Sequence, residues 1–315
     1  MPGKNFIILL SGPTGVGKTA LSLELAERLK TDIVNADSMQ IYRYMDIGTA
    51  KPSSDERTRI RHHLLDIVNP DEPFDAARYL QVATPVIDKL HQEGKIPLVV
   101  GGTGLYMKIL TRGICRGAPT DPAVRQQVLL EEQKYGLRRL YEQLNGVDPL
   151  LAARIHPNDR QRILRALEVF RLTHKPLSYW HQQHHFRESR YRTVKIFLYR
   201  ERDELYRRIN LRVHEMMAQG FLEEVQMLLD MGYGPELKAM QSLGYKHLTE
   251  HLFGRFPLDA AANRLQRDTR RYAKRQMTWF RGDPEFRWIH AQDLENAFES
   301  VIDAVGKSSS LVEFS

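Results

Sequence analysis

The sequence of 315 residues contains a single cysteine, Cys115, which excludes any intramolecular disulfide bond. Because disulfide bonds form and persist mainly in oxidising compartments, a chain without them is expected in the cytosol. Long apolar runs are also missing, and the N-terminal run 6–10 is too short for the hydrophobic region of a signal peptide. Nowhere do about 18 uninterrupted apolar residues predict a membrane span. These absences indicate a cytosolic protein that is neither secreted nor inserted into a membrane.

The sequence does contain enough apolar residues to fold, together with an excess of positive charge. Hydrophobic residues make up 42% of the chain, which suffices for the core of one large domain or two ordinary ones. The 46 Lys and Arg residues outnumber the 39 Asp and Glu residues, so the net charge is +7. A basic protein favours anionic partners such as phosphates or nucleic acid, although net charge alone does not establish either.

Strands and helices are predicted to alternate in the N-terminal part of the chain. The apolar run 6–10 is typical of a strand buried on both faces, and helical spacing follows at 18–29. A short strand is predicted at 33–34, a helix at about 76–92 and another strand at 96–100. This alternation predicts a parallel sheet, so the expected fold class is α/β.

The middle of the chain has a different character. No clear strand is found between about 121 and 180, where several helical patterns occur, including 122–135, 137–144 and 159–173. A polar loop is predicted at 181–189, strand character returns at 194–199, and most of 203–305 is helical. We therefore expect a parallel-sheet α/β core, 1–118 and 192–315, with an inserted all-helical domain at 119–191.

A glycine-rich segment lies between the first predicted strand and the first predicted helix. It matches the pattern G-x-x-x-x-G-K-[ST] and consists of Gly12, Pro13, Thr14, Gly15, Val16, Gly17, Lys18 and Thr19. The backbone N–H groups of such a turn, with the N-terminus of the following helix, bind two linked phosphates. Lys18 would add a positive charge and Thr19 would hold Mg²⁺. An ordinary glycine turn, the alternative, is disfavoured by the flanking strand and helix.

This phosphate loop does not identify a reaction, because kinases, ATPases, GTPases and enzymes with a diphosphate leaving group all bind phosphates in this way. A motor ATPase is disfavoured, since no clear apolar strand ends in aspartate. The segment Leu64-Leu65-Asp66 is short, and the strand at 96–100 ends in glycines.

Polar residues follow two of the predicted strands, at the edge where parallel sheets bind ligands. Asp37 follows the strand at 33–34, and Thr103 follows the strand at 96–100 among several glycines. Asp37 can act as a general base or a Mg²⁺ ligand, or it can cap a helix or form an Asx turn, and spacing leaves these alternatives open. Thr103 can donate to a phosphate oxygen, since glycines allow close approach.

One predicted helix is basic on one side and apolar on the other, where Leu265, Tyr272 and Trp279 lie. Its basic side carries Arg264, Arg267, Arg270, Arg271, Lys274 and Arg275. We interpret this side as contacting nucleic-acid phosphates, in preference to a solvated charged face, because only Asp268 opposes the charge.

A second basic cluster comprises Arg160, Arg162, Arg165 and Arg171. These arginines alternate with apolar residues that are expected in a core, Ile163, Leu167 and Phe170, so the cluster is expected to line a cleft between the domains. The histidines at 62, 63, 181, 184 and 185 lack the spacing of zinc ligands, and no zinc site is expected.

Taken together, these motifs resemble one family, the bacterial-type tRNA dimethylallyltransferases, also called tRNA isopentenyltransferases. The phosphate loop alone occurs in many families, whereas the ordered set of segments is specific, and it spans most of the chain. Besides the loop, the set comprises Asp37-Ser-Met-Gln-Ile-Tyr42, Met45-Asp-Ile-Gly-Thr-Ala-Lys51, His63-Leu-Leu-Asp66, Gly101-Gly-Thr-Gly-Leu-Tyr106, Ala153-Arg-Ile-His-Pro-Asn-Asp159, Leu243-Gly-Tyr245 and Thr269-Arg-Arg-Tyr-Ala-Lys-Arg-Gln-Met-Thr-Trp279.

The resemblance implies a fold and a reaction. The P-loop core and the helical insertion would enclose a channel that the target base enters from one end and dimethylallyl diphosphate from the other. The enzyme would transfer the dimethylallyl group to N6 of the adenosine immediately 3′ of the tRNA anticodon, with Mg²⁺ as cofactor. The phosphate loop would therefore bind the diphosphate of the prenyl donor and not ATP.

The resemblance also implies roles for individual residues. Asp37 would accept a proton from the exocyclic amine, Gln40 would hold the base, and Lys18, Thr19 with Mg²⁺, Thr103 and Arg125 would stabilise the diphosphate. The residues implied to contact the tRNA anticodon stem-loop are Asp37, Ser38, Met39, Gln40, Thr103, Arg125, Gln161, Arg162, Ile163, Leu164, Arg165, Met240, Gln241, Ser242, Leu243, Gly244 and Tyr245. A monomer is expected, because the tRNA can supply the second wall of the site.

Two other functions agree with part of the sequence. A nucleoside or small-molecule kinase would use Asp37 to deprotonate a hydroxyl group and the loop to bind ATP, but it leaves the basic helix and the insertion unexplained. A non-catalytic P-loop RNA-binding protein does not explain the polar groups at the strand ends.

Overall fold

The structure, a computed structural model, describes residues 6–114, 120–184, 190–293, 295–296, 298–299 and 301–303. Cys115 and His185 lie outside these residues. The chain divides into two compact units: unit 1 comprises Met1–Thr111 and Arg190–Ser315, and unit 2 comprises Arg112–Ser189. Unit 2 begins earlier in the chain than the expected insertion, 119–191, and ends at nearly the same place.

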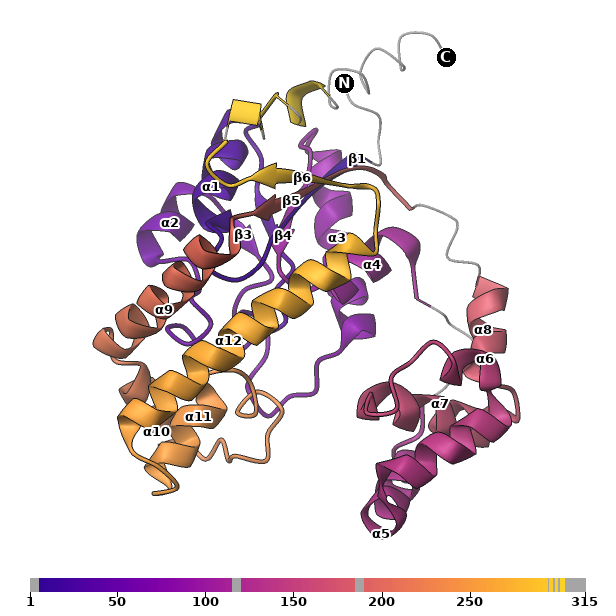
Figure 1. Ribbon diagram of the computed structural model, residues 1–315. Helices are drawn as coiled ribbons and strands as arrows, with labels where there is room; N and C mark the ends of the chain where they lie inside the picture. The colour runs from indigo at the N-terminus through magenta and orange to yellow at the C-terminus, as the bar shows by residue number, and fades with distance from the viewer. Residues whose placement is uncertain are drawn as a thin grey trace, which may run out of the picture. The chain divides into compact units, whose positions relative to one another are not determined.

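A parallel sheet of six strands forms the centre of unit 1 (Figure 1). The strands are β1 (Phe6–Ser11), β2 (Ile33–Asn35), β3 (His62–His63), β4 (Leu98–Gly101), β5 (Arg192–Tyr199) and β6 (Phe286–His290). They lie in the order β3-β2-β4-β1-β5-β6, and each neighbouring pair is parallel. The predicted α/β fold with a parallel sheet is confirmed.

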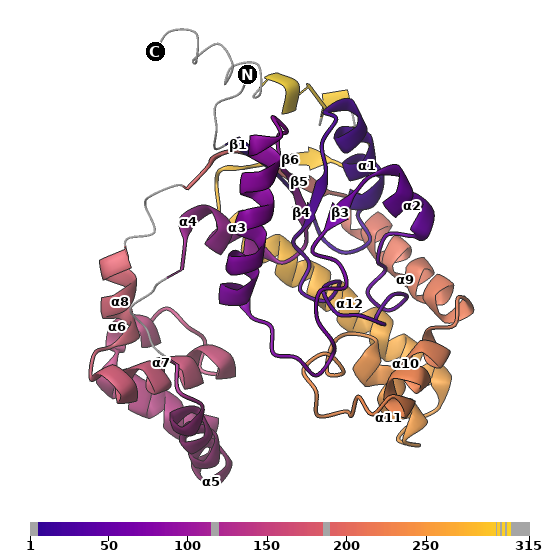
Figure 2. The same ribbon diagram turned by 180° about the vertical axis from the view of Figure 1, so that it is seen from behind.

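Helices cover both faces of this sheet. Ile7 and Leu9 of β1 share a core with α3 (Ala76–Gln92) and α4 (Gly104–Arg112), whereas Ile8 and Leu10 share a core with α1 (Lys18–Arg28). Figure 2 shows α3 in front of the strands from the reverse side. Because both faces of β1 are buried, its sequence is continuously apolar.

The remaining helices of unit 1 include one long helix. They are α2 (Ser54–Arg59), α9 (Arg202–Ala218), α10 (Phe221–Asp230), α11 (Tyr245–Leu252) and the long helix α12 (Leu258–Arg281). In both ribbon views α9, α10 and α11 lie next to α12. Gln276 of α12 is hydrogen-bonded to Thr14 and Gly102, which follow β1 and β4, so α12 crosses the carboxyl ends of these strands.

The prediction that 203–305 is mostly helical missed β6. Its five residues contain the exposed Arg287 and form no continuous apolar run, so the local pattern does not predict a strand. The strand forms because its backbone pairs with β5, with Phe197 opposite Trp288.

Unit 2 contains α5 (Pro122–Val147), α6 (Pro149–Ala152), α7 (Arg160–Thr173) and α8 (Leu177–His184). Gly136, with φ of 80° and ψ of 159°, divides α5 into the two helices predicted at 122–135 and 137–144. The predicted loop 181–189 is wrong for 181–184, which extend α8 because Trp180 packs on the core of the unit; residues 185–189 lie outside the described part. No helix among the described residues is long and apolar enough to cross a membrane.

Candidate active site

The loop between β1 and α1 has the geometry of an anion-binding nest. Gly15 and Gly17 have φ of 79° and 108°, which L side chains rarely adopt, and Gly17 directly precedes α1. Within the described residues, the N–H groups of Gly15, Gly17, Lys18 and Thr19 donate no hydrogen bond. Free N–H groups at a helix N-terminus carry partial positive charge and bind phosphate oxygens.

Positively charged side chains hold the carbonyl groups of the same loop. Lys18 Nζ donates to two of them, at 2.8 and 3.1 Å. Arg208 Nε of α9 donates to the carbonyl oxygen of Gly15, and Arg200 Nε, two residues before α9, donates to that of Val16, each at 2.9 Å. The loop backbone is therefore fixed before any anion binds.

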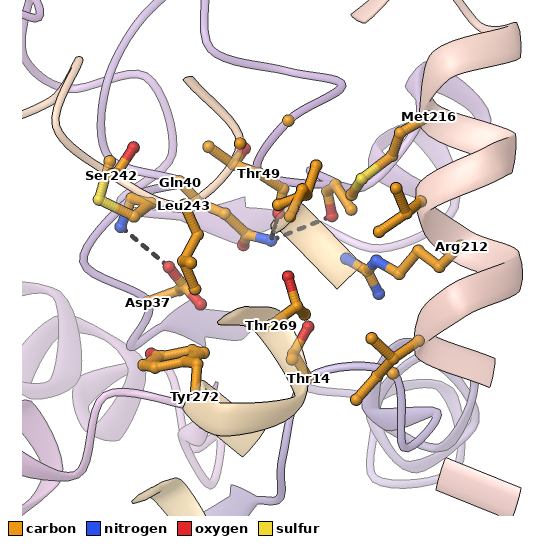
Figure 3. A pocket seen from close by; sticks show the side chains of 18 of the residues that line it. Thr14, Asp37, Gln40, Thr49, Arg212, Met216, Ser242, Leu243, Thr269 and Tyr272 are labelled. Carbon is orange, nitrogen blue, oxygen red and sulfur yellow. Dashed lines mark hydrogen bonds between the residues drawn. The ribbon is translucent and has the colours of Figure 1, made fainter. Parts of the chain in front are cut away.

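A cavity of about 450 Å³ opens beside this loop. Its walls come from the loop, from segments 37–40, 48–50 and 241–245, and from α9 and α12. Figure 3 shows side chains that reach it, among them Thr14, Asp37, Gln40, Arg212, Thr269 and Tyr272. A space enclosed by so many elements can bind a ligand on several sides at once.

Asp37 lies in this cavity with one carboxylate oxygen free. Its Oδ1 accepts the N–H of Met39 at 2.9 Å, so the Asx turn considered from the sequence is present (Figure 3). Its Oδ2 accepts no hydrogen bond from the described part of the chain. The structural and the catalytic interpretations of Asp37 are therefore compatible, because each uses a different oxygen.

Thr103 supports the segment that carries Asp37. The Thr103 hydroxyl accepts the N–H of Ser38 at 3.0 Å, and the Thr103 N–H donates to the carbonyl oxygen of Ala36 at 3.2 Å. Thr103 is absent from the described lining of the cavity, whereas Ser38, Met39 and Gln40 belong to it. Direct contact of Thr103 with a diphosphate stays a prediction, and the structure gives it a positioning contact.

Lys18 and Arg212 line the cavity from different elements. Arg212 of α9 extends into it (Figure 3), and no hydrogen bond or ion pair with a described residue engages its guanidinium. Loss of hydration lowers the pKa of Arg212, and loss of hydration lowers the pKa of Lys18 to about 8, although Asp37 opposes both shifts. An anion entering the cavity would reverse these shifts, because it would pair with the buried charges.

Arg212 was not among the residues singled out from the sequence. A signal was present, since Ile209, Val213 and Met216 lie three residues before, one after and four after it. Helical spacing places Arg212 on the edge of this apolar face, where an arginine is directed towards the interior of the protein.

Gln276 is a second residue at the cavity that the sequence does not single out. Its Oε1 accepts the N–H of Thr14 at 3.0 Å and its Nε2 donates to the carbonyl oxygen of Gly102 at 3.0 Å. A Cβ at Gly102 would lie 2.3 Å from that Nε2, and a Cβ at Gly101 would lie 2.2 Å from the carbonyl oxygen of Ala36. These glycines therefore allow close approach of other protein atoms, whereas the sequence analysis expects them to allow close approach of a phosphate.

The segment 240–245 divides into buried and cavity-lining residues. Gln241, Ser242, Leu243 and Gly244 line the cavity, as does Tyr245, whose side chain is otherwise fully buried. Met240 is fully buried in the core and is absent from the lining, so the expected tRNA contact of its side chain is not supported.

Beside this segment lies a basic groove of about 550 Å³, lined by Gln241, Ser242, Leu243, Lys246, His247, Glu250, Arg264, Arg267, Asp268, Arg271 and Arg275. Arg267 and Arg271 both donate to Asp268 Oδ1 at 3.1 Å, and Arg267 is the main cause that lowers the pKa of Asp268 to about 2. The basic side of α12 is thus partly neutralised, although the remaining charge is positive.

Two residues of α12 depart from the predicted helical wheel. Arg270 donates to Asn210 Oδ1 at 2.6 Å and packs on Tyr206, so it faces α9 and not the groove. Trp279, expected on the apolar side, is 36% exposed. The wheel assigns sides from one helix alone, whereas α12 is flanked by α9, α11 and α4 on different sides.

In unit 2 the predicted contact residues also divide by burial. Ile163 and Leu164 are fully buried in the core of the unit, so the expected tRNA contact of their side chains is not supported. Arg162 is exposed, and Arg125 donates to Gln161 Oε1 at 3.2 Å. The buried carboxylate of Glu168 lies 3.1 Å from Arg165 and 3.7 Å from Arg125 and holds these two cations on one side of the unit.

The other arginines of that cluster form ion pairs inside the unit. Arg160 pairs with Glu132, and Arg171 pairs with Glu131 at 2.7 Å. The expected role of this cluster in lining a cleft between domains stays a prediction.

Thr19 is the predicted Mg²⁺ ligand, and its surroundings offer oxygen atoms. Its exposed side chain lines the cavity together with Asp37. Among the described residues, no group of three or more His, Cys, Asp or Glu is placed to hold a metal ion. Asp66, considered for a strand-end aspartate, instead pairs with Lys51 and Arg57 at 2.5 and 2.7 Å.

Comparison with known proteins points to one family. Residues 40–283 match the family model described as IPP transferase. The chain is 63% identical to the tRNA dimethylallyltransferase of Syntrophobacter fumaroxidans, over 94% of this chain and 86% of that protein. It is 50% identical to the tRNA dimethylallyltransferase of Geobacter sulfurreducens, over 91% of this chain and 92% of that protein.

Two solved structures of similar fold are also named as prenyl transferases of tRNA. The full-length tRNA isopentenylpyrophosphate transferase of Bacillus halodurans matches 99% of this chain and all of its own, with a TM-score of 0.73 and 36% identity. A eukaryotic dimethylallyltransferase acting on tRNA matches 98% of this chain and 80% of its own, with a TM-score of 0.78 and 28% identity.

Proposed function

The chain belongs to the IPP transferase family, and we propose that it is a tRNA dimethylallyltransferase. It transfers the dimethylallyl group of dimethylallyl diphosphate to N6 of the adenosine immediately 3′ of the tRNA anticodon and releases diphosphate. The observation that carries this proposal is the cavity in which the free oxygen of Asp37 shares one space with Lys18, Arg212 and the phosphate loop. Alkyl transfer to an amine requires both a base and a site for an anionic leaving group.

The leaving-group side is formed by the loop and its cations. As the bond between the allylic carbon and the diphosphate oxygen breaks, negative charge grows on the diphosphate and positive charge on the allyl group. Lys18, Arg212 and the free N–H groups of the loop are in place before this charge develops. Such preorganised donors stabilise the transition state more than the bound substrate.

The nucleophile side is formed by the segment 37–40. The amine nitrogen forms the new bond to the allylic carbon, and Asp37 Oδ2 accepts the proton that the amine then loses. A base inside a folded RNA loop must leave its stack to reach a cavity of this kind. Enclosure by α9, α12 and the segment 241–245 limits the access of water, which would otherwise capture the allylic cation.

Mg²⁺ is proposed as the cofactor, with Thr19 as its protein ligand. The residues fit this ion, because Thr19 supplies an oxygen atom and a hard cation prefers oxygen ligands. Mg²⁺ usually takes few protein ligands and completes its shell with phosphate oxygens and waters, which agrees with the lack of a carboxylate cluster among the described residues. When bound, the ion neutralises part of the diphosphate charge.

The tRNA is proposed to contact the basic groove beside the cavity. Groove and cavity share Gln241, Ser242, Leu243 and Arg275, so a nucleotide in the cavity would bring its neighbouring phosphates towards Arg267 and Arg271. In unit 2, the members of the implied set that are not buried are proposed to contact the tRNA as well: the exposed Gln161 and Arg162 and the partly buried Arg165 and Arg125.

The test is transfer of label. The protein is incubated with dimethylallyl diphosphate carrying a labelled allyl group and with unmodified tRNA, and label is expected in the RNA and in no free nucleoside. ATP labelled in its γ-phosphate, offered with nucleosides in place of the donor, is expected to give no labelled product. Label transfer from ATP, with none from dimethylallyl diphosphate, would show that the chain is a kinase.

A further inference from the structure

A buried carboxylate accepts hydrogen bonds from a backbone segment that reaches the cavity. Glu224 of α10 is 8% exposed. Its Oε2 accepts the N–H groups of Asp46 and Ile47 at 2.9 and 2.7 Å. Its Oε1 accepts the N–H of Gly48 at 3.1 Å and the hydroxyl of Tyr245 at 2.6 Å. Hydrogen bonds to an ionised acceptor are about twice as strong as neutral ones, so Glu224 holds this segment firmly.

Packing leaves the same segment no freedom to move towards α10. A Cβ added at Gly48 would lie 2.2 Å from the Phe221 ring and 2.7 Å from the Tyr245 ring. These two rings meet edge to face with centroids 5.1 Å apart. Further along, the nearly inaccessible ammonium group of Lys51 donates to the Tyr42 carbonyl oxygen at 2.5 Å. The backbone is therefore fixed on both sides of Thr49 and Ala50.

The carbonyl groups of Thr49 and Ala50 determine how Gln40 presents its amide. Gln40 Nε2 donates to both, at 3.2 and 3.1 Å, so both amide hydrogens are used. Exchanging the amide atoms would place an oxygen against two carbonyl oxygens, which the hydrogen-bond network forbids. Gln40 Oε1 accepts no hydrogen bond within the described chain, and Gln40 lines the cavity with Asp37 (Figure 3). The amide is thereby restricted to one role towards a ligand, that of acceptor.

We propose that Glu224 is a positioning residue that makes the cavity selective for a base with a primary amine. It fixes segment 46–48, the carbonyl groups of Thr49 and Ala50 then orient Gln40, and Gln40 Oε1 and Asp37 Oδ2 form a pair of acceptors. An exocyclic NH₂ group has two hydrogens and satisfies both acceptors, whereas a keto oxygen satisfies neither and is repelled by both. Once Asp37 has passed the accepted proton to solvent, the product, a secondary amine with one hydrogen, leaves one acceptor unpaired, which favours its release.

This inference rests on the proposed function and deepens it. The experiment compares anticodon stem-loop RNAs that carry either adenosine or inosine at the target position. The adenosine RNA is the substrate, and the inosine RNA is used as a competitive inhibitor, because it has a keto oxygen in place of the amine. The ratio of the two dissociation constants measures selection at the amine and cancels contributions from the RNA stem.

The wild-type protein is expected to favour adenosine by at least about tenfold, since one lost hydrogen bond to a charged group is worth about that factor. In Glu224→Gln an NH₂ group replaces one carboxylate oxygen and faces backbone N–H groups of residues 46–48, with which it cannot form hydrogen bonds. The ratio of the dissociation constants for the inosine and adenosine RNAs is therefore expected to fall towards one. The KM for dimethylallyl diphosphate should change by less than about twofold. A merely structural role would lower both RNA affinities equally and leave the ratio unchanged.

Glu223→Gln is the matched control, because Glu223 is the exposed neighbour on the same helix and should keep the wild-type ratio. Should Glu224→Gln fail to fold, Tyr245→Phe removes a single hydrogen bond to Glu224 and Gln40→Ala removes the second acceptor, and both should lower the ratio. A ratio unchanged in the folded variants, or a wild type without preference, would overturn the proposal. Absence of prenyl transfer to the adenosine RNA would instead overturn the proposed function, which the transfer assay reads separately.

Discussion

Replacing Arg212 by methionine should stabilise the empty protein while weakening its reaction. The guanidinium is partly buried and has no hydrogen-bond partner among the described residues, and burial lowers its pKa. A desolvated charge without a partner costs about 1 kcal/mol when it remains partly exposed. Methionine keeps the length and the apolar contacts, so the free energy of unfolding should rise by about this amount, which corresponds to about 2–4 °C in Tm.

The loss of activity follows from the same charge. Hydrogen bonds that Arg212 would donate to the diphosphate are charge-assisted, and each is worth about 1.5–3 kcal/mol. The value of kcat/KM should therefore fall by about 10- to 150-fold. Because the leaving group gains charge as the bond breaks, kcat should fall as well as the affinity for the donor.

The assay combines thermal unfolding of the empty protein with steady-state transfer kinetics. Arg208→Met is the matched control from the same helix, since Arg208 Nε donates to the Gly15 carbonyl oxygen at 2.9 Å and its loss should lower Tm. Added inorganic diphosphate should raise the Tm of the wild type more than that of Arg212→Met. The reasoning fails if Arg212→Met lowers Tm as Arg208→Met does, or if kcat/KM is unchanged.

Three further outcomes are expected. Because the pKa of Lys18 is about 8 in the empty protein, affinity for a non-reactive donor analogue should be constant below that pH and weaken as the pH rises through it. In Lys18→Arg the affinity should not change over this pH range. Equal pH profiles of affinity in the two proteins would contradict the assignment. Asp37→Asn should lower the single-turnover rate by about 10²–10⁴-fold with donor affinity kept or improved, whereas lost donor affinity rescued by Mg²⁺ would make Asp37 a metal ligand. Replacing Arg267 and Arg271 together by alanine should flatten the slope of log Kd for tRNA against log salt by about one to two, and an unchanged slope would exclude phosphate contact in the groove.

Much of the fold is encoded in local patterns. The apolar run of β1 and the helical spacing of α3 depend on residues a few positions apart, so the sequence predicts both elements nearly to their ends. The phosphate loop is equally local, since its glycines, Lys18 and Thr19 are consecutive and their conformation follows from glycine geometry.

Local sequence patterns give a wrong prediction where contact with another element determines the structure. The strand β6 exists because β5 offers it an edge, and residues 181–184 are helical because Trp180 packs on the core of unit 2. Arg270 belongs by its position to a basic stripe, yet α9 supplies Asn210 as its partner. In each case a tertiary contact, which the local sequence pattern does not contain, determined the observed structure.

The sequence by itself determined the parallel P-loop core, the loop proposed to bind phosphates and the candidate base Asp37. Only the tertiary structure decided that Arg212 faces the cavity and that Glu224 fixes the acceptor at Gln40. It also decided that one oxygen of Asp37 and the guanidinium of Arg212 have no partner among the described residues. The physical reason is sequence separation: Gln276 bonds to Thr14 across 262 positions, and Glu224 bonds to the N–H of Ile47 across 177. Such contacts arise when the sheet brings distant segments together, and no periodicity along the chain records them.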